Sequence, residues 1–487
     1  MENEETLTVG EVKTRSVSGV VALMSRTFII QIISFVATLV LTLYLDPQTY
    51  GIFYLVSSVV NFLSYFSDIG LAAALVQKHT AVTKKDLATT FTLQQILVLS
   101  SLTILYFLSP FIKRQYSLDA NASFLLFAVG ASFLLSSLKT IPSIMLEREI
   151  KFNKLILPQV LETLTFNLVA VYCALKGMGV NSFSYAVLAR GIVGLVTMYI
   201  VYPWMPSIGI YRESLKSLLK FGLPYQTNTI LAILKDDGVT ILLTKIIGTS
   251  GLGYIGWASK WSGLPLRVVM DNLSKVSFPA FARLQHDKER LTQAVEVSLK
   301  YLLLIVLPIL IGMGFIANPL ASAIPRYQKW LPAIIPLYFY LYNSAWASIS
   351  TSLTNLLNAT GNIKVTFKLM IMWTSLTWLT MPIMAIKFGY LGVAYATGII
   401  ATSSFVTIYL TRKIININFA HILKTPFISS IFMSIFLFFG IKLAGTNPYF
   451  ILTFLVLSLA VYGISVLIIE GKQFFVTTKN YFLLKHV

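Results

Sequence analysis

Long apolar runs separated by short polar turns fill most of this chain, from about Val17 to Glu470. A membrane-spanning helix needs roughly 20 predominantly apolar residues. The pattern predicts fourteen such helices, at residues 17–45, 49–73, 88–111, 120–144, 155–176, 181–203, 218–246, 250–282, 291–316, 331–359, 366–387, 390–411, 426–445 and 449–470. We therefore predict an all-α integral membrane protein with fourteen transmembrane helices and almost nothing outside the lipid.

Composition supports this class and limits what the polar connections can hold. The 487 residues are 56% hydrophobic and only 12% charged, with a mean hydropathy of +0.76, whereas about a quarter of the residues of soluble domains are charged. The longest connections, near 204–220 and 412–425, have room for short interfacial helices. A soluble catalytic domain is excluded within this sequence, so function is expected inside the membrane.

The net charge of +19 predicts topology and not nucleic-acid binding, because Lys and Arg are dispersed among many short loops. With the N-terminus in the cytoplasm, 22 of the 38 basic residues fall in inner loops and termini and 8 in outer loops. The positive-inside rule then places both termini of this multi-pass protein in the cytoplasm. The polar start, with Glu2, Glu4 and Glu5, is unlike a cleavable signal peptide, and the lone Cys173 allows no intrachain disulfide.

A weak internal repeat appears when the sequence is shifted by 202 residues. The segment 38–42 then overlies 240–244, and Tyr50-Gly51-Ile52 overlies Leu252-Gly253-Tyr254. Two parallel lobes of six helices would produce this pattern, although apolar helices also resemble one another by chance. The predicted organisation is a cytoplasmic segment 1–16, an N-lobe 17–203, a linker 204–217, a C-lobe 218–411, a linker 412–425, two appended helices at 426–470 and a cytoplasmic tail 471–487.

Charged residues inside predicted spans are the main site candidates, because a charge at the bilayer centre is costly and marks function by default. Lys260, Arg267, Asp271 and Lys275 share one face of the eighth span, about 80° wide at 100° per residue. Such a stripe must line a water-filled cavity or pair across helices. We expect pairing with Lys235-Asp236-Asp237 of the seventh span.

Other polar residues allow both a cavity and a packing interpretation. The first span carries Thr27, Gln31, Ser34, Thr38 and Thr42, and the second carries Ser57, Asn61, Ser64 and Asp68. Hydroxyl and amide groups suit sugar hydroxyls, yet Ser and Thr also mediate helix packing in membranes. Arg26 and Arg190 are further cationic candidates. We favour structural or interfacial roles for Lys139, Glu162 and Lys300. We favour packing over sugar stacking for the aromatic residues Tyr338, Tyr340, Tyr342 and Trp346.

Five motifs resemble the polysaccharide-transporter branch of the MOP superfamily, the Wzx-type flippases of lipid-linked oligosaccharides. They are Leu-Asp-Pro-x-x-Tyr-Gly at 45–51, Asp-Ile-Gly-Leu-x-x-Ala-Leu-Val-Gln at 68–77, Pro-x-x-x-Leu-x-Arg-x-x-Lys-Phe at 142–152, Phe-Gly-x-Pro at 221–224 and Leu-Leu-Asn-Ala-Thr-Gly at 356–361. The resemblance implies a MATE-like fold of two six-helix lobes around a central cavity that opens alternately to each side. It also implies lipid-linked, undecaprenyl-pyrophosphate-type oligosaccharide as cargo for surface polysaccharide biosynthesis.

The buried charges favour this function over its rivals. A drug or cation antiporter of the same superfamily should have an acidic or apolar cavity, whereas the stripe at 260–275 carries three cations, and a guanidinium suits pyrophosphate. A polymerase or ligase would need a long external loop, and a scaffold would leave the buried charge unexplained. We expect a transporter without enzyme activity, metal or cofactor, coupled to H⁺ or Na⁺ through Asp68, Asp236 or Asp237. Membrane lipid, and polymerase and chain-length proteins, are the expected partners of a monomer.

Overall fold

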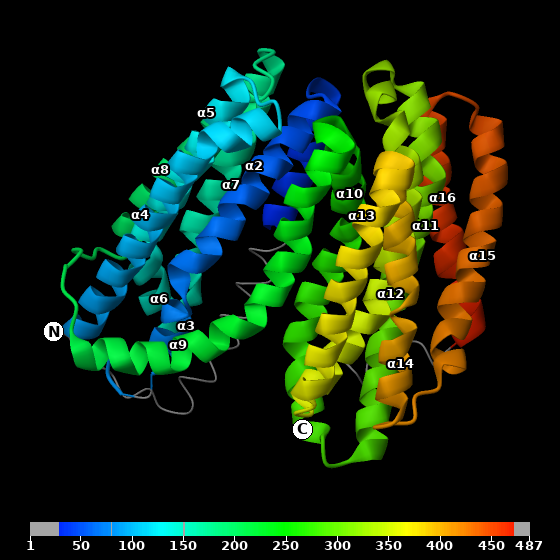
Figure 1. Cartoon of the computed structure of the whole chain (residues 1–487). Helices are drawn as coiled ribbons and strands as arrows, with labels where there is room; N and C mark the ends of the chain where they lie inside the picture. The colour runs from blue at the N-terminus through cyan, green and yellow to red at the C-terminus, as the bar shows by residue number, and fades with distance from the viewer. Residues whose placement is uncertain (1–28, 79, 150, 472–487) are drawn as a thin grey trace. The chain divides into compact units, whose positions relative to one another are not determined.

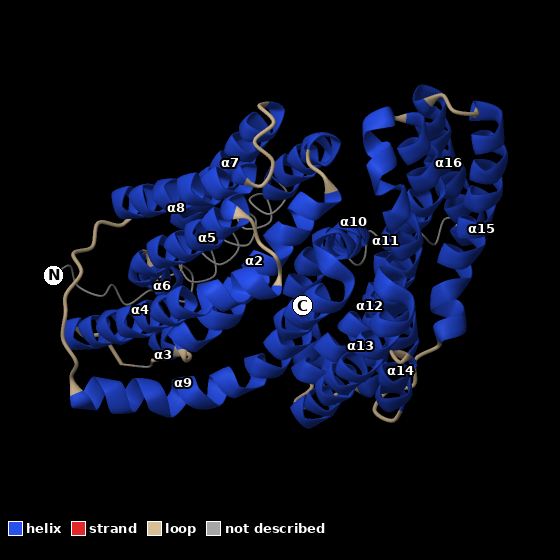
Figure 2. Cartoon of the chain, turned by 45° about the horizontal axis from the view of Figure 1, so that its top comes forward, coloured by secondary structure: helices blue, strands red, loops and turns tan. Residues whose placement is uncertain are grey.

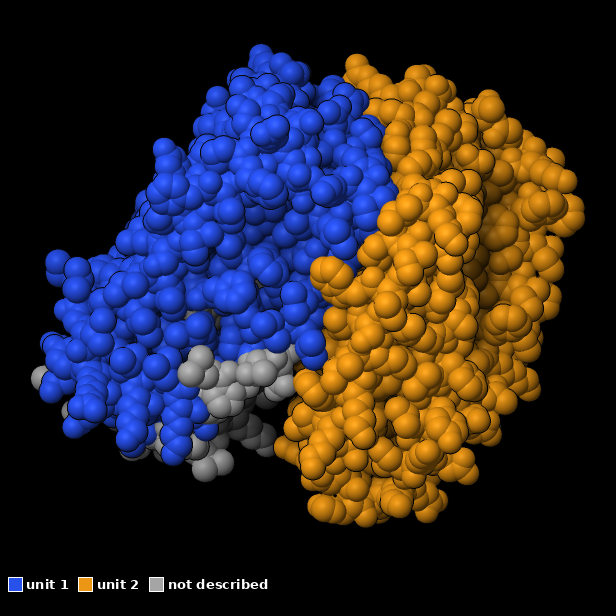
Figure 3. Space-filling model, in the orientation of Figure 1, with its two compact units in different colours: residues 1–253 blue, residues 254–487 orange. Residues whose placement is uncertain are grey.

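The computed structural model describes residues 29–78, 80–149 and 151–471, except for the side chains of 68, 221, 223–225 and 227–229. Within these ranges every regular element is a helix, and no strand occurs (Figure 2). The chain forms two compact units, residues 1–253 and 254–487 (Figure 3). The predicted linker at 204–217 does not coincide with this division, and the predicted lobe boundaries stay a prediction.

Unit 1 is a bundle of long helices with several short ones at one end (Figure 1). Its elements are a first helix described over Ile29–Tyr44, α2 (Pro47–Asp68), α3 (Leu71–Gln77), α4 (Lys84–Gln115), α5 (Ala120–Leu138), α6 (Thr140–Arg148), α7 (Phe152–Leu175), α8 (Asn181–Val201), α9 (Arg212–Ile233), the π-helix η1 (Leu234–Gly238) and the first part of α10 (Val239–Leu284). Helix α9 crosses the ends of α3 and α4 (Figures 1 and 2).

Unit 2 takes up the rest of α10 and seven further elements. They are α11 (Lys288–Ala323), the 3₁₀ segment η2 (Pro325–Ala333), α12 (Ile334–Ala359), α13 (Ile363–Thr402), α14 (Phe405–Arg412), α15 (Phe419–Ala444) and α16 (Pro448–Glu470). Helix α11 packs against α12, α15 and α16. Leu304 of α11 lies in a buried cluster with Met433 and Leu437 of α15 and Tyr462 of α16, so the last two helices are fastened to the unit by apolar packing.

The structure places a helix in each predicted span, but the described residues hold nine helices that are long and apolar enough to cross a membrane. Residues 363–412 count as one candidate helix, although two spans are predicted there. The first helix is described only from residue 29, so its described part is too short to count. Three further predicted spans, 218–246, 250–282 and 331–359, contain too many polar or charged residues to qualify by composition. The number fourteen therefore stays a prediction.

Glycines with positive φ mark three predicted breaks between spans. Gly248, at φ 73°, falls in the predicted gap between residues 246 and 250, and Gly389, at φ 60°, falls between 387 and 390. Gly445, at φ 57°, follows α15. A side chain disfavours these backbone angles, so glycine lets the chain reverse or kink there.

Two predicted spans are each broken where the sequence predicts continuity. Span 49–73 is divided into α2 and α3 at Gly70, which has φ 77°. Span 120–144 is divided into α5 and α6 at Lys139, whose φ of −94° and ψ of 2° leave the helical region. The short helices α3 and α6 then pack together with α9, burying Leu71, Leu75, Ile141 and Leu218 in one cluster.

Candidate functional site in the membrane helices

The charged stripe of α10 lies in unit 2, and Arg267 is its most prominent member. Arg267 and Asp271 are exposed, whereas Lys260 and Lys275 are partly buried. The guanidinium lies over Gly263, because a Cβ there would meet Arg267 Nη2 at 3.7 Å and Nε at 3.9 Å. Lys260 is close enough to Arg267 for the two cations to repel each other. The stripe thus concentrates positive charge on one face of α10.

Tryptophan packing on α10 holds this helix against η2. Trp257 stacks on the fully buried Trp330, with ring centroids 5.4 Å apart and an interplanar angle of 19°. Trp261 meets Trp257 at 6.2 Å in an edge-on arrangement, and Asn355 of α12 donates a hydrogen bond to Ser274 Oγ at 2.8 Å. These contacts fix the rotation of α10 and hence the direction of its charged face.

The acids of the predicted seventh span lie on the π-helix η1 in unit 1. Lys235 forms an ion pair with Asp236 of its own turn, and Asp237 accepts hydrogen bonds from Ser58 and Asn61 of α2. The structure therefore brings two sequence candidates, Asn61 and Asp237, into contact. Pairing of these acids with the α10 cations stays a prediction, since the contacts found for Asp236 and Asp237 lie within unit 1.

A π-helical turn is rare and often marks a functional position, because it widens the helix by one residue per turn. Here it follows α9 directly and places three charged residues in succession. Thr240 donates to the carbonyl of Asp236 at 2.7 Å and helps to close the turn. We regard η1 as the element that aims Asp237 at α2.

The polar stripe of the first span is largely a packing feature. Thr38 and Thr42 are buried and donate to the carbonyls of Ser34 and Thr38, both at 2.6 Å. Such back-bonding satisfies a hydroxyl within its own helix. Gln31 is half-buried, and Asn61 is exposed and contacts Asp237 as described above. Arg26 and the side chain of Asp68 lie outside the described residues.

Arg190 of α8 belongs to a cluster with two residues that sequence reasoning interpreted as structural. Its Nε lies 3.8 Å from Glu162 Oε2, and Lys139 forms an ion pair with Oε1 of the same carboxylate. Glu162 occupies the middle of α7 and is 7% exposed.

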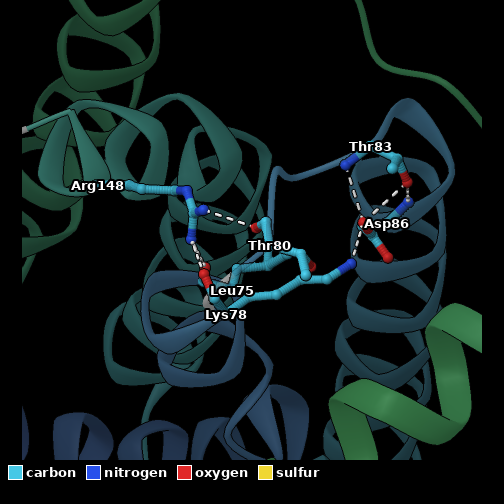
Figure 4. A network of polar contacts seen from close by, with 6 residues as sticks. All are labelled: Leu75, Lys78, Thr80, Thr83, Asp86 and Arg148. Carbon is cyan, nitrogen blue, oxygen red and sulfur yellow. Dashed lines mark hydrogen bonds and ion pairs between the residues drawn. The ribbon is translucent and has the colours of Figure 1, made fainter. Parts of the chain in front are cut away.

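A second polar network holds the turn between α3 and α4 (Figure 4). The Arg148 guanidinium, at the end of α6, donates to the carbonyls of Leu75, Lys78 and Thr80 at 2.9, 2.7 and 2.9 Å. Lys78 pairs with Asp86 at 2.5 Å. Asp86 also completes a capping box with Thr83 at the start of α4. Arg148 thus closes the end of α3, whose last carbonyls have no helical partner.

Tyr202, just beyond α8, adds a contact on the same side of unit 1. Its hydroxyl donates to Glu149 Oε1 at 3.3 Å. This hydrogen bond joins the end of α8 to the end of α6.

A cavity of about 620 Å³ lies in unit 2 between α11, α12 and α15. Its wall is mainly aliphatic, with polar groups from Asn318, Tyr338, Tyr342 and Ser434. Tyr342 also shares a hydrogen bond with Thr402 at 3.2 Å. Of the aromatic cluster named from sequence, Tyr338 and Tyr342 line this cavity, while Tyr340 and Trp346 do not.

Comparison with solved structures identifies the fold. The lipid II flippase MurJ in an inward closed conformation superposes with a TM-score of 0.76 over 93% of this chain and 99% of that chain, at 16% sequence identity. An inward-facing multidrug resistance MATE transporter of the MOP superfamily gives a TM-score of 0.60 over 81% of this chain and 98% of that chain, also at 16% identity. The architecture is thus that of MurJ and the MATE transporters.

Sequence comparison finds relatives named for polysaccharide biosynthesis. The succinoglycan biosynthesis transport protein ExoT of Rhizobium meliloti is 23% identical over 63% of this chain, and the teichuronic acid biosynthesis protein TuaB of Bacillus subtilis is 25% identical over 55%. The matches span 61% of ExoT and 55% of TuaB. The lipopolysaccharide biosynthesis protein WzxC of Escherichia coli is 22% identical over 73% of this chain and 72% of its own length.

The family model described as polysaccharide biosynthesis protein matches residues 40–335, which is more than half of the chain. Among the described residues, no group of three or more His, Cys, Asp or Glu could hold a metal ion. The five sequence motifs, the all-helical MurJ-like architecture and this match agree. The chain therefore belongs to the polysaccharide biosynthesis protein family and is a multi-pass membrane protein with the fold of MurJ and the MATE transporters.

Proposed function

We propose that this protein moves lipid-linked oligosaccharide repeat units, of the undecaprenyl-pyrophosphate type, across the cytoplasmic membrane by alternating access. The observation that carries the proposal is the cationic face of α10, where Arg267 is exposed and Lys260 lies close to it. A guanidinium binds phosphate oxygens in a bidentate manner. An anionic cargo therefore accounts for charges that would be costly in a membrane helix without one.

Two kinds of relative support this choice of cargo. ExoT is named as a transport protein of succinoglycan biosynthesis, and WzxC is named for lipopolysaccharide biosynthesis. MurJ, which shares the fold, is named a flippase of lipid II. We infer an inner-membrane location with both termini in the cytoplasm, a transporter that is not an enzyme, and partners among polysaccharide polymerase and chain-length proteins.

A cation gradient is the proposed energy source, since this sequence carries no nucleotide-binding motif. Asp237 is the best placed of the predicted coupling residues, because its carboxylate already has two neutral donors, Ser58 and Asn61, on α2. Collapse of the proton or sodium gradient should then stop export. Export that continues after both gradients are collapsed would remove this part of the proposal.

The decisive experiment replaces Arg267 in cells that depend on this protein for surface polysaccharide. Arg267→Gln should abolish the polymer while membrane abundance stays normal, and Arg267→Lys should restore part of it because charge remains without the guanidinium fork. Lys387→Gln, an exposed lysine elsewhere in unit 2, is the matched control and should export normally. Normal polymer in Arg267→Gln cells would exclude the stripe from the mechanism.

The lipid-linked intermediate separates this function from its rivals. A flippase defect leaves single repeat units on the inner face of the membrane, where an impermeant lectin added to spheroplasts cannot reach them. A polymerase or ligase defect leaves them on the outer face, where the lectin binds. A drug antiporter would instead change resistance to organic cations without any change in lipid-linked sugar.

A further inference from the structure

The ion cluster of unit 1 has more positive than negative charge. Lys139, at the joint of α5 and α6, and Arg190, in α8, both face the single carboxylate of Glu162. Within the described part of the chain, no second carboxylate lies within 4 Å of either cation. One unit of positive charge is thus left uncompensated within the helical bundle, where it is costly unless an anion is present.

The carboxylate of Glu162 occupies a space made for it on α8. A Cβ at Gly194 would lie 2.4 Å from Glu162 Oε1 and 2.6 Å from its Cδ. Only glycine at this position lets the side chain of Glu162 reach between α7 and α8. The arrangement is therefore specific to these residues, and Glu162 is held beside Arg190 by shape as well as by charge.

Arg190 is accessible although it projects from the inner face of α8. At 100° per residue it lies roughly 20° from the buried Phe183 and roughly 160° from Ile192, which is 53% exposed. Its side chain is nevertheless 55% exposed. The guanidinium is therefore accessible to a polar ligand although it lies on this face of α8.

Glu162 leaves most of this guanidinium unused. The contact at 3.8 Å involves Nε alone and is longer than a hydrogen bond. The planar guanidinium carries two further nitrogens, whose fork geometry matches phosphate oxygens. Lys139, by contrast, is 16% exposed and directly bonded to the carboxylate, so it contributes charge and holds Glu162 in place.

We propose that Arg190, with Lys139 and Glu162, forms a binding site for a phosphate-bearing anion in unit 1. Arg190 binds the phosphate oxygens, Lys139 adds positive charge, and Glu162 is a positioning residue that competes with the anion for the guanidinium. The site is additional to the charged face of α10. That its ligand is the pyrophosphate of a lipid-linked sugar rests on the proposed function, whereas binding of a phosphate group does not.

The test measures pyrophosphate binding to the full-length protein in nanodiscs of neutral phosphatidylcholine, at constant ionic strength. All variants carry Arg267→Gln, so that the face of α10 contributes little. In this background Arg190→Gln should weaken binding of labelled inorganic pyrophosphate by about tenfold or more. Glu162→Gln should strengthen it severalfold, because the competing negative charge is gone. Lys176→Gln, an exposed lysine beyond the end of α7, should leave it unchanged.

Gly194→Ala provides a second variant that changes no charge. The added methyl must displace Glu162, so binding should again strengthen, in the direction of Glu162→Gln. A purely structural ion cluster predicts the opposite: both substitutions would lower the melting temperature and neither would improve binding. If Arg190→Gln is not monodisperse, Arg190→Lys keeps the charge and should give an intermediate affinity.

Separate arms identify the source of the phosphate. Polyprenyl pyrophosphate placed in the nanodisc should displace inorganic pyrophosphate if the ligand is the carrier lipid, and phosphatidylglycerol should do so if it is a membrane headgroup. Displacement by neither leaves a soluble phosphate as the ligand. Equal pyrophosphate affinity in the Arg190→Gln and parent proteins would overturn the inference and leave the proposed function intact. Loss of export in Arg267→Gln cells does not depend on this result.

Discussion

Gly70 and Gly222 meet backbone to backbone where α9 crosses the break between α2 and α3. A Cβ at Gly70 would lie 2.3 Å from the carbonyl oxygen of Gly222, and one at Gly222 would lie 2.7 Å from that of Ile69. Tyr65 and Gln226 add a reciprocal pair of hydrogen bonds at 2.5 and 3.1 Å. The family motifs at 68–77 and 221–224 thus supply the two glycines that allow this close helix crossing.

Gly222→Ala should destabilise the protein because the methyl group has no space against this backbone. Overpacking of this kind costs roughly 1–3 kcal/mol, which thermal unfolding in detergent would detect. Gly463→Ala is the control, since a Cβ at Gly463 meets no atom within 4 Å. It should be neutral or slightly stabilising, because alanine favours helix. Equal melting temperatures for the two variants would contradict the close backbone contact at Gly222.

Alanine substitutions at Gly51 and Gly253 should have strongly coupled effects on stability. A Cβ at Gly51 would lie 1.7 Å from the carbonyl oxygen of Thr249, and one at Gly253 would lie 1.8 Å from that of Pro47. Each alanine variant should cost about 3 kcal/mol, at the upper end of the usual range for overpacking. The double variant should cost less than their sum by roughly 1–3 kcal/mol, because the first substitution already separates the two turns.

The control for this comparison of single and double variants combines Gly51→Ala with Gly463→Ala. The stability changes of these two substitutions should add. Folded fraction against denaturant or temperature provides the measurement. Additive effects for Gly51 and Gly253 would show that the two glycines act in separate places, and the reciprocal contact would then be refuted.

Arg148 should not be replaceable by lysine. Three carbonyls at the end of α3 share its guanidinium, and an ammonium on a single stem cannot reach all of them. We expect Arg148→Lys and Arg148→Gln each to cost about 2–4 kcal/mol. Arg290→Gln removes an arginine that is 73% exposed and should cost below about 0.5 kcal/mol. Comparable losses for Arg290 and Arg148 would disprove the capping role.

The ion pair of Lys300 and Glu470 should fasten α16 to α11. Lys300 Nζ lies 2.6 Å from Glu470 Oε1, and both side chains are largely buried, at 16% and 14% exposure. Thr425 of α15 also donates to this carboxylate. Lys300→Gln leaves the carboxylate unpaired and should cost about 3 kcal/mol.

The exchanged pair Lys300→Glu with Glu470→Lys tests the direction of the effect. It should recover part of the stability lost in Lys300→Glu alone, measured by thermal unfolding. An exchanged protein less stable than either single variant would indicate that the positions act through something other than their mutual charge.

The apolar pattern was sufficient to place the helices and several of their breaks, because both follow from local sequence. Gly248 and Gly389 interrupt the pattern and adopt angles that other residues avoid. The break at Lys139 was not predicted, and the ion pair that Lys139 makes there joins it to Glu162, 23 positions away. Tertiary contacts of this kind leave no periodic signal.

The site was predictable in part. Charge inside the predicted spans pointed to α10, Arg190 and Asp237, and the polar pattern of the second span named Asn61, which contacts Asp237. It did not show that Glu162 lies beside Arg190. The available signal was the glycine at 194, one helical turn after Arg190, which makes room for a side chain from another helix. The family motifs, in contrast, form structural joints at Gly51, Gly70 and Arg148.

The contact of Gly51 with Thr249 and of Gly253 with Pro47 is reciprocal under the shift of 202 residues that the sequence repeat predicts. Each turn therefore packs against the other through equivalent positions. A side chain that enlarges one turn is resisted by the backbone of the other, so neither turn can change independently. We therefore expect both positions to be restricted to glycine together among related sequences.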